Sequence, residues 1–445
     1  MASTDPRLIP LLDTSKRPEP KVLPHPLGGE RYTSRDFMER EWERVWTRVW
    51  QIGCLESELT ETGDFVTHEI GRESLIFARH TNGEIRGFYN VCQHRGNRLV
   101  PEERGRSGAF VCPYHGWVWQ TDGELRKVQD EEDFPESPCG RLSLTPVRVE
   151  TWAGFVWFNL DPDAGPLMEF LDPVARQMDT YRMQDMVRTG YTTVEVDCNW
   201  KVIQDNFSES YHIPTVHPGL KYFLDDTYQS TQFDLYERGH TRMIMVGGGP
   251  SERAHGNEEL ILRGLREELE GWGLDPESFR GRLGDMRAEL QRQKRKLSGE
   301  RGYDFSHYVD EQLTDHLHYT VFPNLAFSMK PEGCIFLRPN PHPTDPEKCL
   351  FDCWYFTLFP EGDDTSRVQQ TDGVWSTSRE PAAHSKGLLG EVPLGAGISE
   401  DASVFISQQQ GLRSRAFGGA TLAGQERRIA YYHQVIDEYL DGSRG

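Results

Sequence analysis

The chain has 445 residues, which is enough for two domains that each bury a sizeable core. Its content of 36% hydrophobic and 11% aromatic residues is typical of a globular protein and excludes a disordered one. The net charge of -21, from 70 acidic against 49 basic residues, argues against a nucleic-acid partner, because binding to phosphate backbones requires clustered Lys and Arg.

The start of the chain and its cysteines bear on the cellular compartment. The first residues lack the basic start and apolar core of a signal peptide, and no stretch approaches the length of a membrane span. The eight cysteines do not have the spacing of a disulfide scaffold. We therefore expect a cytoplasmic protein with no membrane partner.

The first predicted elements are a helix and a small β domain. Thr33 and Asp36 favour a helix that runs to about Val49. Over residues 51–160, short β-rich runs such as SLIFARH, GAFVCPYH and GFVWFNL alternate with Gly, Asn and Asp turns, which predicts an antiparallel β domain. The prolines and glycine of residues 162–166 indicate its exit linker.

Two segments of this β domain carry a metal-binding pattern. Cys92 and His94 form one pair, Cys112 and His115 form the second, and residues 95–111 separate them. A glycine follows each pair, where loop backbone must pack closely around a cofactor. Two thiolates and two imidazoles on paired loops can bind either zinc or an iron–sulfur centre.

The pairing of these ligands favours iron. A Cys2His2 zinc finger places both cysteines on one knuckle and both histidines on a helix, whereas each segment here carries one of each. In a Rieske [2Fe–2S] centre two cysteines hold one iron and two histidines hold the other, which requires this mixed pairing. The histidines also leave ring N–H groups at the tip of the cluster as exits for electrons. Zinc remains the alternative.

A second metal-binding pattern lies in NWKVIQDNFSESYHIPTVHP, residues 199–218. Helical spacing places Asp205, Glu209 and His212 on one face and the apolar positions between them on the core side. The residues predicted to face the core are Trp200, Ile203, Phe207 and Tyr211.

A proline then allows a second histidine to approach the first. Pro214 should end the helix, because proline cannot continue the backbone ladder, and let His217 turn back toward His212. One carboxylate from elsewhere would complete the two-histidine-one-carboxylate face of non-haem Fe(II) oxygenases, which leaves about three positions open. A histidine in an apolar helix is more often a core residue, so these two residues alone leave both interpretations open.

The rest of the chain adds strands, a charged insertion and a late acid. Antiparallel strands are predicted after His316 and His318, two histidines that alternate on one strand and are hydrogen-bonded or line a pocket. Residues 251–297 are charged and helical, which predicts a solvated helical pair, with a partner-binding element or a lid as alternatives. Asp401 lies near the start of a late amphipathic helix, where an N-cap is the competing role.

The segments CQH and CPYHGW, followed by NWKVIQDNFSESYHIPTVHP, resemble the large (α) subunit of Rieske non-haem iron oxygenases, the aromatic-ring-hydroxylating dioxygenase family. The likeness covers nearly the whole chain. It implies an α+β fold, with a small antiparallel β Rieske domain and a helix-grip catalytic domain in which an antiparallel sheet wraps a long helix. The implied division is an N-terminal helical segment that packs on the catalytic domain (1–48), the Rieske domain (49–162) and the catalytic domain (163–445), with an insertion at 251–297.

The resemblance also implies roles for the candidate residues. The family's ED-x-x-V…Q-x-GL segment selects Asp401 as the third ligand of a mononuclear Fe(II), beside His212 and His217. In the family an acid bridges the first of these histidines to a Rieske histidine of the neighbouring subunit. Glu209 holds that place here and would reach His115 of the neighbour, with Asp205 as the competing acid. The implied assembly is a homotrimer or an α3β3 complex.

The implied reaction uses O2 and an organic small molecule. The sequence shows no dinucleotide fingerprint and no plant-type ferredoxin cysteine run, so electrons should come from a separate NAD(P)H-dependent reductase, directly or through a ferredoxin. Aromatic residues around 222–236 and 319–337 suggest an apolar pocket and favour cis-dihydroxylation of an aromatic or other apolar ring. The alternatives are a Rieske monooxygenase or demethylase that acts on a quaternary amine or another non-aromatic substrate, and an electron carrier with only the Rieske cluster.

Overall fold

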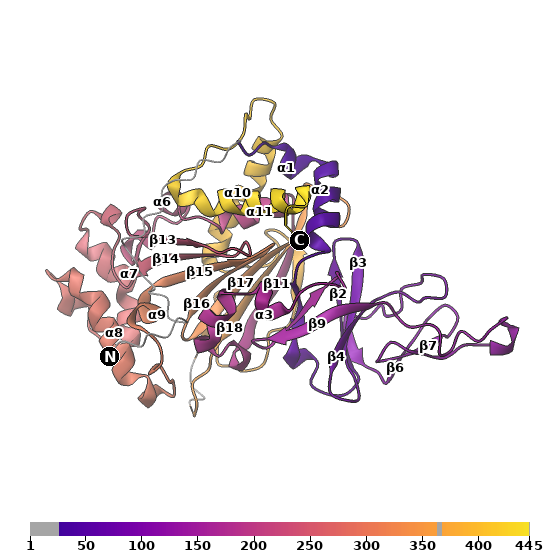
Figure 1. Ribbon diagram of the computed structural model, residues 1–445. Coiled ribbons are helices and arrows are strands. Elements are labelled where there is room, and N and C mark those ends of the chain that lie inside the picture. Colours follow the sequence, from indigo (N-terminus) through magenta and orange to yellow (C-terminus); the bar gives the residue numbers. More distant parts are fainter. Residues whose placement is uncertain (1–25, 363–366, 445) are drawn as a thin grey trace. The chain divides into compact units, whose positions relative to one another are not determined.

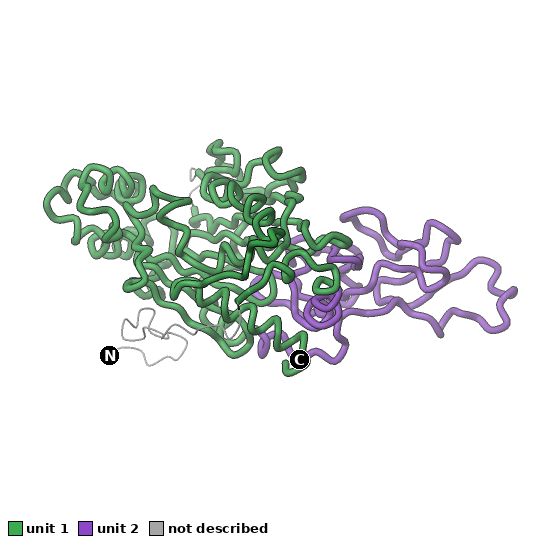
Figure 2. Tube along the Cα trace, turned by 90° about the horizontal axis from the view of Figure 1, so that it is seen from above, with its two compact units in different colours: residues 1–38, 171–444 green, residues 39–170, 445 purple. Residues whose placement is uncertain are grey.

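The computed structural model describes residues 26–362 and 367–444, so the chain start that we expect to lack a signal peptide lies outside the described residues. The described chain forms two compact units (Figure 2). One unit contains residues 39–170, and the other contains residues 26–38 with 171–444. Within these ranges, every helix is too short or too polar to cross a bilayer.

The unit of residues 39–170 is built on antiparallel strands, as predicted. One sheet has the strand order β1-β10-β9-β4-β3-β2-β5, and a smaller sheet has the order β6-β7-β8. Their apolar side chains share a core with the two cysteine segments, and Trp119 and Ile76 are fully buried in it. The strands are β1 (Gln51–Leu55), β2 (Asp64–Ile70), β3 (Glu73–Arg79), β4 (Ile85–Tyr89), β5 (Arg104–Arg106), β6 (Ala109–Val111), β7 (Val118–Gln120), β8 (Leu125–Lys127), β9 (Pro146–Trp152) and β10 (Phe155–Asn159).

The larger unit is organised around a second sheet with the order β12-β14-β15-β16-β17-β18-β11-β21, in which β13 also pairs with β14. The pairs are antiparallel except for β11 with β21. The strands are β11 (Val187–Val196), β12 (Leu224–Asp225), β13 (Gln232–Leu235), β14 (Thr241–Gly247), β15 (His316–Val321), β16 (Leu325–Lys330), β17 (Gly333–Pro341), β18 (Cys349–Thr357) and β21 (Ser385–Leu388), with a separate hairpin of β19 (Val368–Gln369) and β20 (Trp375–Ser376).

Helices cover one face of this sheet. α5 packs on β17 and β18, and α10 packs on α5. Figure 1 shows α10 and α11 lying across the same side of the sheet. The predicted combination of an antiparallel sheet with a gripped helix is therefore confirmed. Over both units, the α-helices of the described residues are α1 (Glu30–Thr33), α2 (Arg35–Glu41), α3 (Leu167–Phe170), α4 (Val174–Met178), α5 (Trp200–Asn206), α6 (Ile213–Val216), α7 (Glu258–Gly271), α8 (Met286–Leu297), α9 (Asp310–Thr314), α10 (Ala396–Leu412) and α11 (Arg427–Asp441).

The N-terminal helix is more broken than predicted. An extended Ser34 separates α1 from α2, and its Oγ accepts a hydrogen bond from the backbone N–H of Phe37 at 3.3 Å. Ser34 rather than Thr33 therefore caps α2. A π-helical turn over Trp42–Trp46 follows, so a regular helix does not continue to Val49.

The predicted metal helix is also shorter than expected. α5 ends at Asn206, and Glu209 and His212 lie in the segment that connects it to α6. Pro214 does not end a helix; it lies in the first turn of α6, where a missing N–H removes no backbone hydrogen bond. The helical-face prediction was wrong for Tyr211 as well, because 58% of this residue is exposed.

The charged insertion forms two helices, as predicted, but they are not simply solvated. α7 buries an apolar side of four residues, and a fully enclosed lysine of α8 anchors the pair. The Lys294 ammonium lies 2.9 Å from Glu268 Oε1 and 3.4 Å from Glu332 Oε1, and it donates to the carbonyl of Leu313 at 2.8 Å. The buried residues of α7 are Ile261, Leu262, Leu265 and Leu269.

We expect Lys294→Met to destabilise this unit by about 2–3 kcal/mol. Removing one partner of a fully buried ion pair costs about 3–5 kcal/mol, and the loss is smaller here because both carboxylates are more than a quarter exposed. Chemical denaturation followed by tryptophan fluorescence measures the effect. Lys296→Met, an exposed lysine on the same helix, is the matched control and should change the free energy of unfolding by less than about 0.5 kcal/mol. Equal effects of the two substitutions would contradict the anchoring role.

Candidate metal centres and substrate pocket

The two cysteine segments fold into loops with the same backbone hydrogen bonds. The Cys92 N–H donates to the carbonyl of Asn97 at 2.8 Å, and the Cys112 N–H donates to that of Trp117 at 2.8 Å. In each loop the cysteine carbonyl accepts from a glycine N–H four residues later. Both glycines, at positions 96 and 116, have a positive φ of 74° and 68°, a conformation that side-chain-bearing residues rarely adopt. The repeat places one thiol and one imidazole at equivalent points of the two loops.

These loops bring the four predicted ligands together. The thiols of Cys92 and Cys112 are buried and in contact, and burial raises the pKa of the Cys92 thiol. The rings of His94 and His115 lie 4.6 Å apart between centroids. His94 Nδ1 is buried without a hydrogen-bond partner, and its ring stacks on Trp117. Two thiols in contact and an unpaired ring nitrogen fit a metal cluster, which would satisfy all of these atoms.

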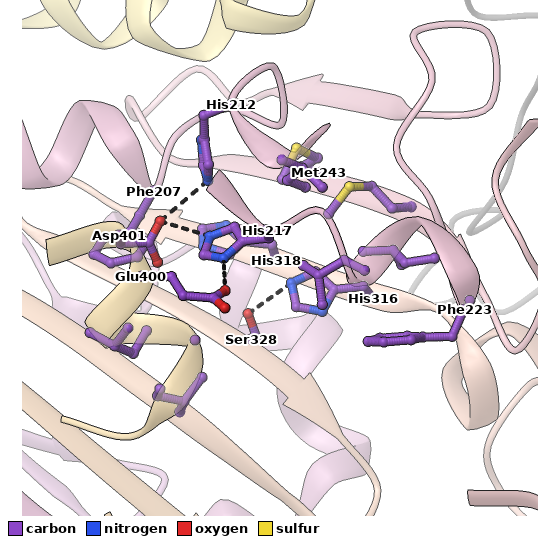
Figure 3. Close-up of a pocket in the computed structure, with 18 of the residues that line it drawn as sticks. Phe207, His212, His217, Phe223, Met243, His316, His318, Ser328, Glu400 and Asp401 are labelled. Carbon is purple, nitrogen blue, oxygen red and sulfur yellow. Dashed lines mark hydrogen bonds and ion pairs between the residues drawn. The ribbon is translucent and has the colours of Figure 1, made fainter. Parts of the chain in front are cut away.

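The second predicted site gathers two histidines and a carboxylate from distant elements. One ligand atom each from His212, His217 and Asp401 lies within 4.8 Å of the others. Asp401 Oδ1 is 2.9 Å from His217 Nε2 and 3.3 Å from His212 Nε2 (Figure 3). Asp401 lies in the second turn of α10, which begins at Ala396, so the competing N-cap interpretation does not apply.

Other carboxylates orient both imidazoles. Glu209 Oε1 lies 2.6 Å from His212 Nδ1, and Glu400 Oε2 lies 2.6 Å from His217 Nδ1. The second oxygen of Glu209 also accepts a hydrogen bond from the backbone N–H of His212 at 3.1 Å. With each Nδ1 facing a carboxylate, each Nε2 is directed at the space beside Asp401, which is the usual arrangement around a metal-bound histidine.

The carboxylates of this site favour positive charge between them. Burial favours the neutral form of His212, but its hydrogen bonds to Asp401 and Glu209 outweigh burial and raise its pKa to about 10. For Asp401, burial raises the pKa, but the hydrogen bonds from His212 and His217 prevail and lower it. A divalent metal between the three ligand atoms would supply the positive charge that these carboxylates stabilise. The residues present therefore fit a mononuclear metal.

The hydrogen bonds of the Asp205 side chain go to residues outside this triad. Its carboxylate accepts a hydrogen bond from Tyr32 Oη at 2.6 Å and lies 3.1 Å from His433 Nε2. Both partners are buried, and His433 belongs to α11. Asp205 therefore ties the N-terminal segment and α11 to α5, whereas Glu209 contacts the candidate metal ligand His212.

Comparison with known protein families gives two matches that divide the chain. Residues 49–140 match the Rieske [2Fe-2S] domain, and residues 183–442 match the ring-hydroxylating alpha subunit (catalytic domain). The chain belongs to the Rieske oxygenase large subunits. It is 33% identical over 230 residues to the carnitine monooxygenase oxygenase subunit of Escherichia coli K12, a match that covers 51% of this chain and 60% of that protein.

One further sequence relative has a different named activity, and one solved structure has the same fold. The chain is 30% identical over 338 residues to the biphenyl 2,3-dioxygenase subunit alpha of Rhodococcus jostii RHA1, a match that covers 74% of this chain and 67% of that one. Among solved structures, a quaternary ammonium Rieske monooxygenase superposes with a TM-score of 0.67 at 20% identity over 96% of this chain and 98% of that chain. At that identity the superposition shows a shared fold.

A pocket of the larger unit opens at the triad. It has a volume of about 270 Å³, and the triad residues, Glu209 and Glu400 form part of its wall. Most of its lining is apolar, and a polar stripe comes from β15, β16, the insertion helix α7 and the last residue of α9. The apolar residues are Phe207, Ile213, Leu220, Phe223, Leu224, Met243, Met245, Ile335, Leu337 and Ile398; the polar stripe is Thr314, His316, His318, Ser328, Lys330 and Glu268.

The aromatic prediction for this pocket was right in only one region. Phe223 lines the pocket, as the aromatics around 222–236 suggested. The aromatics of 319–337 instead pack with one another, with Phe327 stacked on Tyr319 at 5.3 Å and in contact with Phe336 at 5.0 Å between ring centroids. Successive side chains of a strand point to opposite faces of the sheet. On β16, Ser328 and Lys330 face the pocket, and Phe327 therefore faces the other side.

Sequence reasoning missed several residues of the site. Glu400 was not selected because the family resemblance selects Asp401, next to it, as the metal ligand. The contact of Glu400 with His217 depends on the rotation of α10 about its axis, which the sequence does not specify. Asn206 donates to Asp401 Oδ1 at 2.9 Å, across almost two hundred residues of chain. The alternation of His316 and His318 was the one available signal for the polar stripe, and both residues prove to line the pocket and to be hydrogen-bonded.

Proposed function

We propose that this protein is the catalytic subunit of an oxygenase that uses O2 and electrons from a separate NAD(P)H-dependent reductase to cis-dihydroxylate an aromatic or other apolar ring. The observation that carries the proposal is the triad of His212, His217 and Asp401 at the wall of a largely apolar pocket. Two imidazoles and one carboxylate leave positions on an Fe(II) open for O2 beside the substrate.

The residues divide the work between two centres. We propose that Cys92, His94, Cys112 and His115 hold the Rieske cluster, which supplies single electrons when bound. At the mononuclear site, Glu209 and Glu400 hold the two histidines with Nε2 toward the metal position. The apolar lining limits access of water and positions a ring next to the triad.

We propose that electrons cross between subunits. Glu209 contacts His212 through Nδ1 and would accept a hydrogen bond from His115 of a neighbouring subunit in a ring of three chains, either a homotrimer or an α3β3 complex. Two exposed tyrosines support contacts at both ends of this route, because Tyr114 beside the cluster and Tyr211 beside Glu209 are each more than half exposed. The reductase would deliver electrons directly or through a ferredoxin.

The boundaries and the compartment belong to the same proposal. We divide the chain into an N-terminal segment (1–48), a Rieske domain (49–162) and a catalytic domain (163–445) with its insertion at 251–297. The family matches to 49–140 and 183–442 support this division. All eight cysteines lie in the described residues and are unpaired, which supports a cytoplasmic location.

A second candidate function has its own support. The relatives named carnitine monooxygenase and glycine betaine monooxygenase suggest a monooxygenase that acts on a quaternary amine. The Glu268 carboxylate in the pocket wall could attract such a cation. Against this function, Phe207 and Phe223 are the aromatic residues of the described pocket lining, and recognition of quaternary ammonium groups usually uses a cage of several aromatic rings.

Metal analysis of anaerobically purified protein tests the proposal first. We expect about three irons and two acid-labile sulfides per chain, with a Rieske-type electron paramagnetic resonance signal after reduction with dithionite. Oxygen uptake and product analysis with ring and quaternary-amine substrates, in the presence of a reductase, then separate the two candidate functions. Zinc without sulfide would overturn both, and a cluster without a second iron site after addition of Fe(II) would favour an electron carrier.

A further inference from the structure

A buried arginine behind the pocket lacks a carboxylate partner. Arg428 of α11 is fully buried, and within residues 26–362 and 367–444 it forms no ion pair. Its Nε donates to Thr241 Oγ1 at 2.6 Å, and Thr241 in turn shares a hydrogen bond with Thr320 at 2.6 Å across β14 and β15. Burial lowers the pKa of Arg428 to about 9, so the guanidinium remains protonated at neutral pH. The structure therefore keeps a buried cation at a fixed position without a carboxylate in contact, and the charges of Glu209 and Asp234 act on it from a distance.

This guanidinium contacts a histidine of the pocket wall. Arg428 Nη2 lies 3.2 Å from His318 Nδ1. Because a guanidinium has only donors, Nδ1 must accept and the ring proton must reside on Nε2. Burial holds the pKa of His318 well below its usual range, and the Arg428 cation lowers it further, so the ring is neutral. His318 Nε2 has no hydrogen-bond partner in the part of the chain that the structure describes.

The sheet register aligns other donors with this ring. His318 pairs with Ser328 across the antiparallel strands β15 and β16. His316 lies two residues before His318 and Lys330 lies two residues after Ser328, so both are on the same face and toward the same end of the pair. His316 Nε2 is 3.1 Å from Ser328 Oγ (Figure 3). The Lys330 ammonium has no ion-pair partner among the described residues. One wall of the pocket therefore combines hydrogen-bond donors with the Lys330 ammonium, and the Arg428 guanidinium lies directly behind His318.

The carboxylate of the pocket wall outside the metal site already has cationic partners. Glu268 is the pocket-lining carboxylate outside the metal site, and Lys294 lies 2.9 Å from it. Burial raises the pKa of Glu268, but Lys294 and Lys330 prevail and lower it, so it remains ionised within this cluster. The field at the β15–β16 wall thus favours an anion over a cation.

We propose that Arg428 fixes His318 in the tautomer that donates from Nε2 into the pocket, and that His318, with Lys330 beside it, binds an anionic oxygen of the substrate. The substrate class is then an apolar ring that bears a carboxylate. Its ring occupies the apolar part of the pocket beside the triad, and its carboxylate faces β15. This inference rests on the proposed function and refines it, because it disfavours a quaternary amine as the substrate. Arg428 acts as a positioning residue, and His318 determines specificity.

Binding of three matched probes tests this inference without turnover. 2-Naphthoate, 2-naphthamide and trimethyl(2-naphthyl)ammonium share a bicyclic ring and differ in charge, and competition saturation-transfer-difference NMR ranks their affinities for the intact holoenzyme. We expect 2-naphthoate to bind at least about tenfold more tightly than the cation, because its charged carboxylate can accept the hydrogen bond that the cation cannot. Equal affinities, or a preference for the cation, would overturn the proposal.

Substitutions then assign the preference to residues. His318→Leu and Arg428→Met should each reduce the ratio of naphthoate to cation affinity about tenfold or more, whereas His318→Asn and Arg428→Lys, which keep a donor, should retain part of it. His240→Leu is the matched control, because His240 is a buried histidine next to β14 that does not line the pocket. It should lower stability and leave the ratio unchanged.

The ratio of naphthoate to cation affinity shows whether His318 binds the anion or only supports the pocket wall. If His318→Leu weakens all three probes equally, the donor role is wrong and His318 only supports the wall. If the probe preference holds but no ring substrate is oxidised, the proposed dioxygenation fails while the binding inference stands. If a ring substrate is dihydroxylated with no dependence on His318, the proposed function stands and this inference fails.

Discussion

Asp401→Ala should abolish turnover and empty the mononuclear site while the Rieske cluster remains. Asp401 supplies the carboxylate oxygen that lies 2.9 Å and 3.3 Å from the two histidine nitrogens, and the triad is incomplete without it. Loss of an outer partner of a metal ligand already costs about 10–100-fold in metal affinity, so loss of the ligand itself should cost more than about 100-fold. We expect iron to fall from about three to about two per chain, with sulfide and the Rieske signal unchanged.

The neighbouring acid of the same helix is the control. Glu400 touches only the outer nitrogen of His217, and its side chain is 54% exposed, so Glu400→Ala should weaken iron binding about 10–100-fold without removing the site. Added Fe(II) should restore activity in this variant and not in Asp401→Ala. Iron retained at the wild-type level in Asp401→Ala would contradict its role as a ligand. An unchanged visible spectrum shows that the cluster unit has kept its fold.

The Rieske loops could be predicted from the sequence because their information is local. Each ligand pair lies within four residues, and the glycines at positions 96 and 116 mark the tight loops that their positive φ angles confirm. The backbone pattern of Cys92 and Cys112 then follows from hydrogen bonds that span only a few residues. Such short-range features do not depend on how distant parts of the chain pack.

The mononuclear site was predictable in composition but not in local structure. His212 and His217 were recognisable by residue type, but the helix that should have carried His212 ends at Asn206. Glu209 accepts the backbone N–H of His212 and holds the segment in a turn, so a side-chain contact overrides the helical period. Because Glu400 joins His217 across 183 residues, its role depends on the packing of α10 and had no local signal.

The polar wall of the pocket could be predicted only in part, from the alternation of His316 and His318, for a related reason. His318 and Arg428 are 110 residues apart, and their contact requires both the register of β15 and the phase of α11. For residues 251–297 a lid was one of the predicted alternatives, but the sequence did not indicate that α7 places Glu268 in the pocket wall. The family resemblance supplied the reaction class, whereas the features that select a substrate come from long-range packing that is particular to this chain.

Glu209→Gln should retain both metal centres and lose most turnover. The carboxylate lies 2.6 Å from His212 Nδ1, and it is the acid that we propose to connect this histidine to His115 of a neighbouring subunit. Glutamine keeps the shape of the side chain but removes the charge and one acceptor, so we expect the rate of electron transfer to fall about 10–100-fold. Rapid mixing of the reduced, substrate-bound protein with O2, followed by the visible spectrum of the cluster, measures this rate.

Asp205→Asn is the control for Glu209→Gln. It tests whether electron transfer needs Glu209 in particular or any buried acid in this region. Asp205 binds Tyr32 and His433 and supports the packing of α11, so its substitution should lower the midpoint of thermal unfolding and leave the oxidation rate of the cluster unchanged. Glu209→Gln should do the reverse, because Glu209 joins neighbouring residues of one segment and a candidate metal ligand. Full activity of Glu209→Gln would exclude the bridge. Slow electron transfer in a stable Asp205→Asn variant would instead assign the bridging role to Asp205.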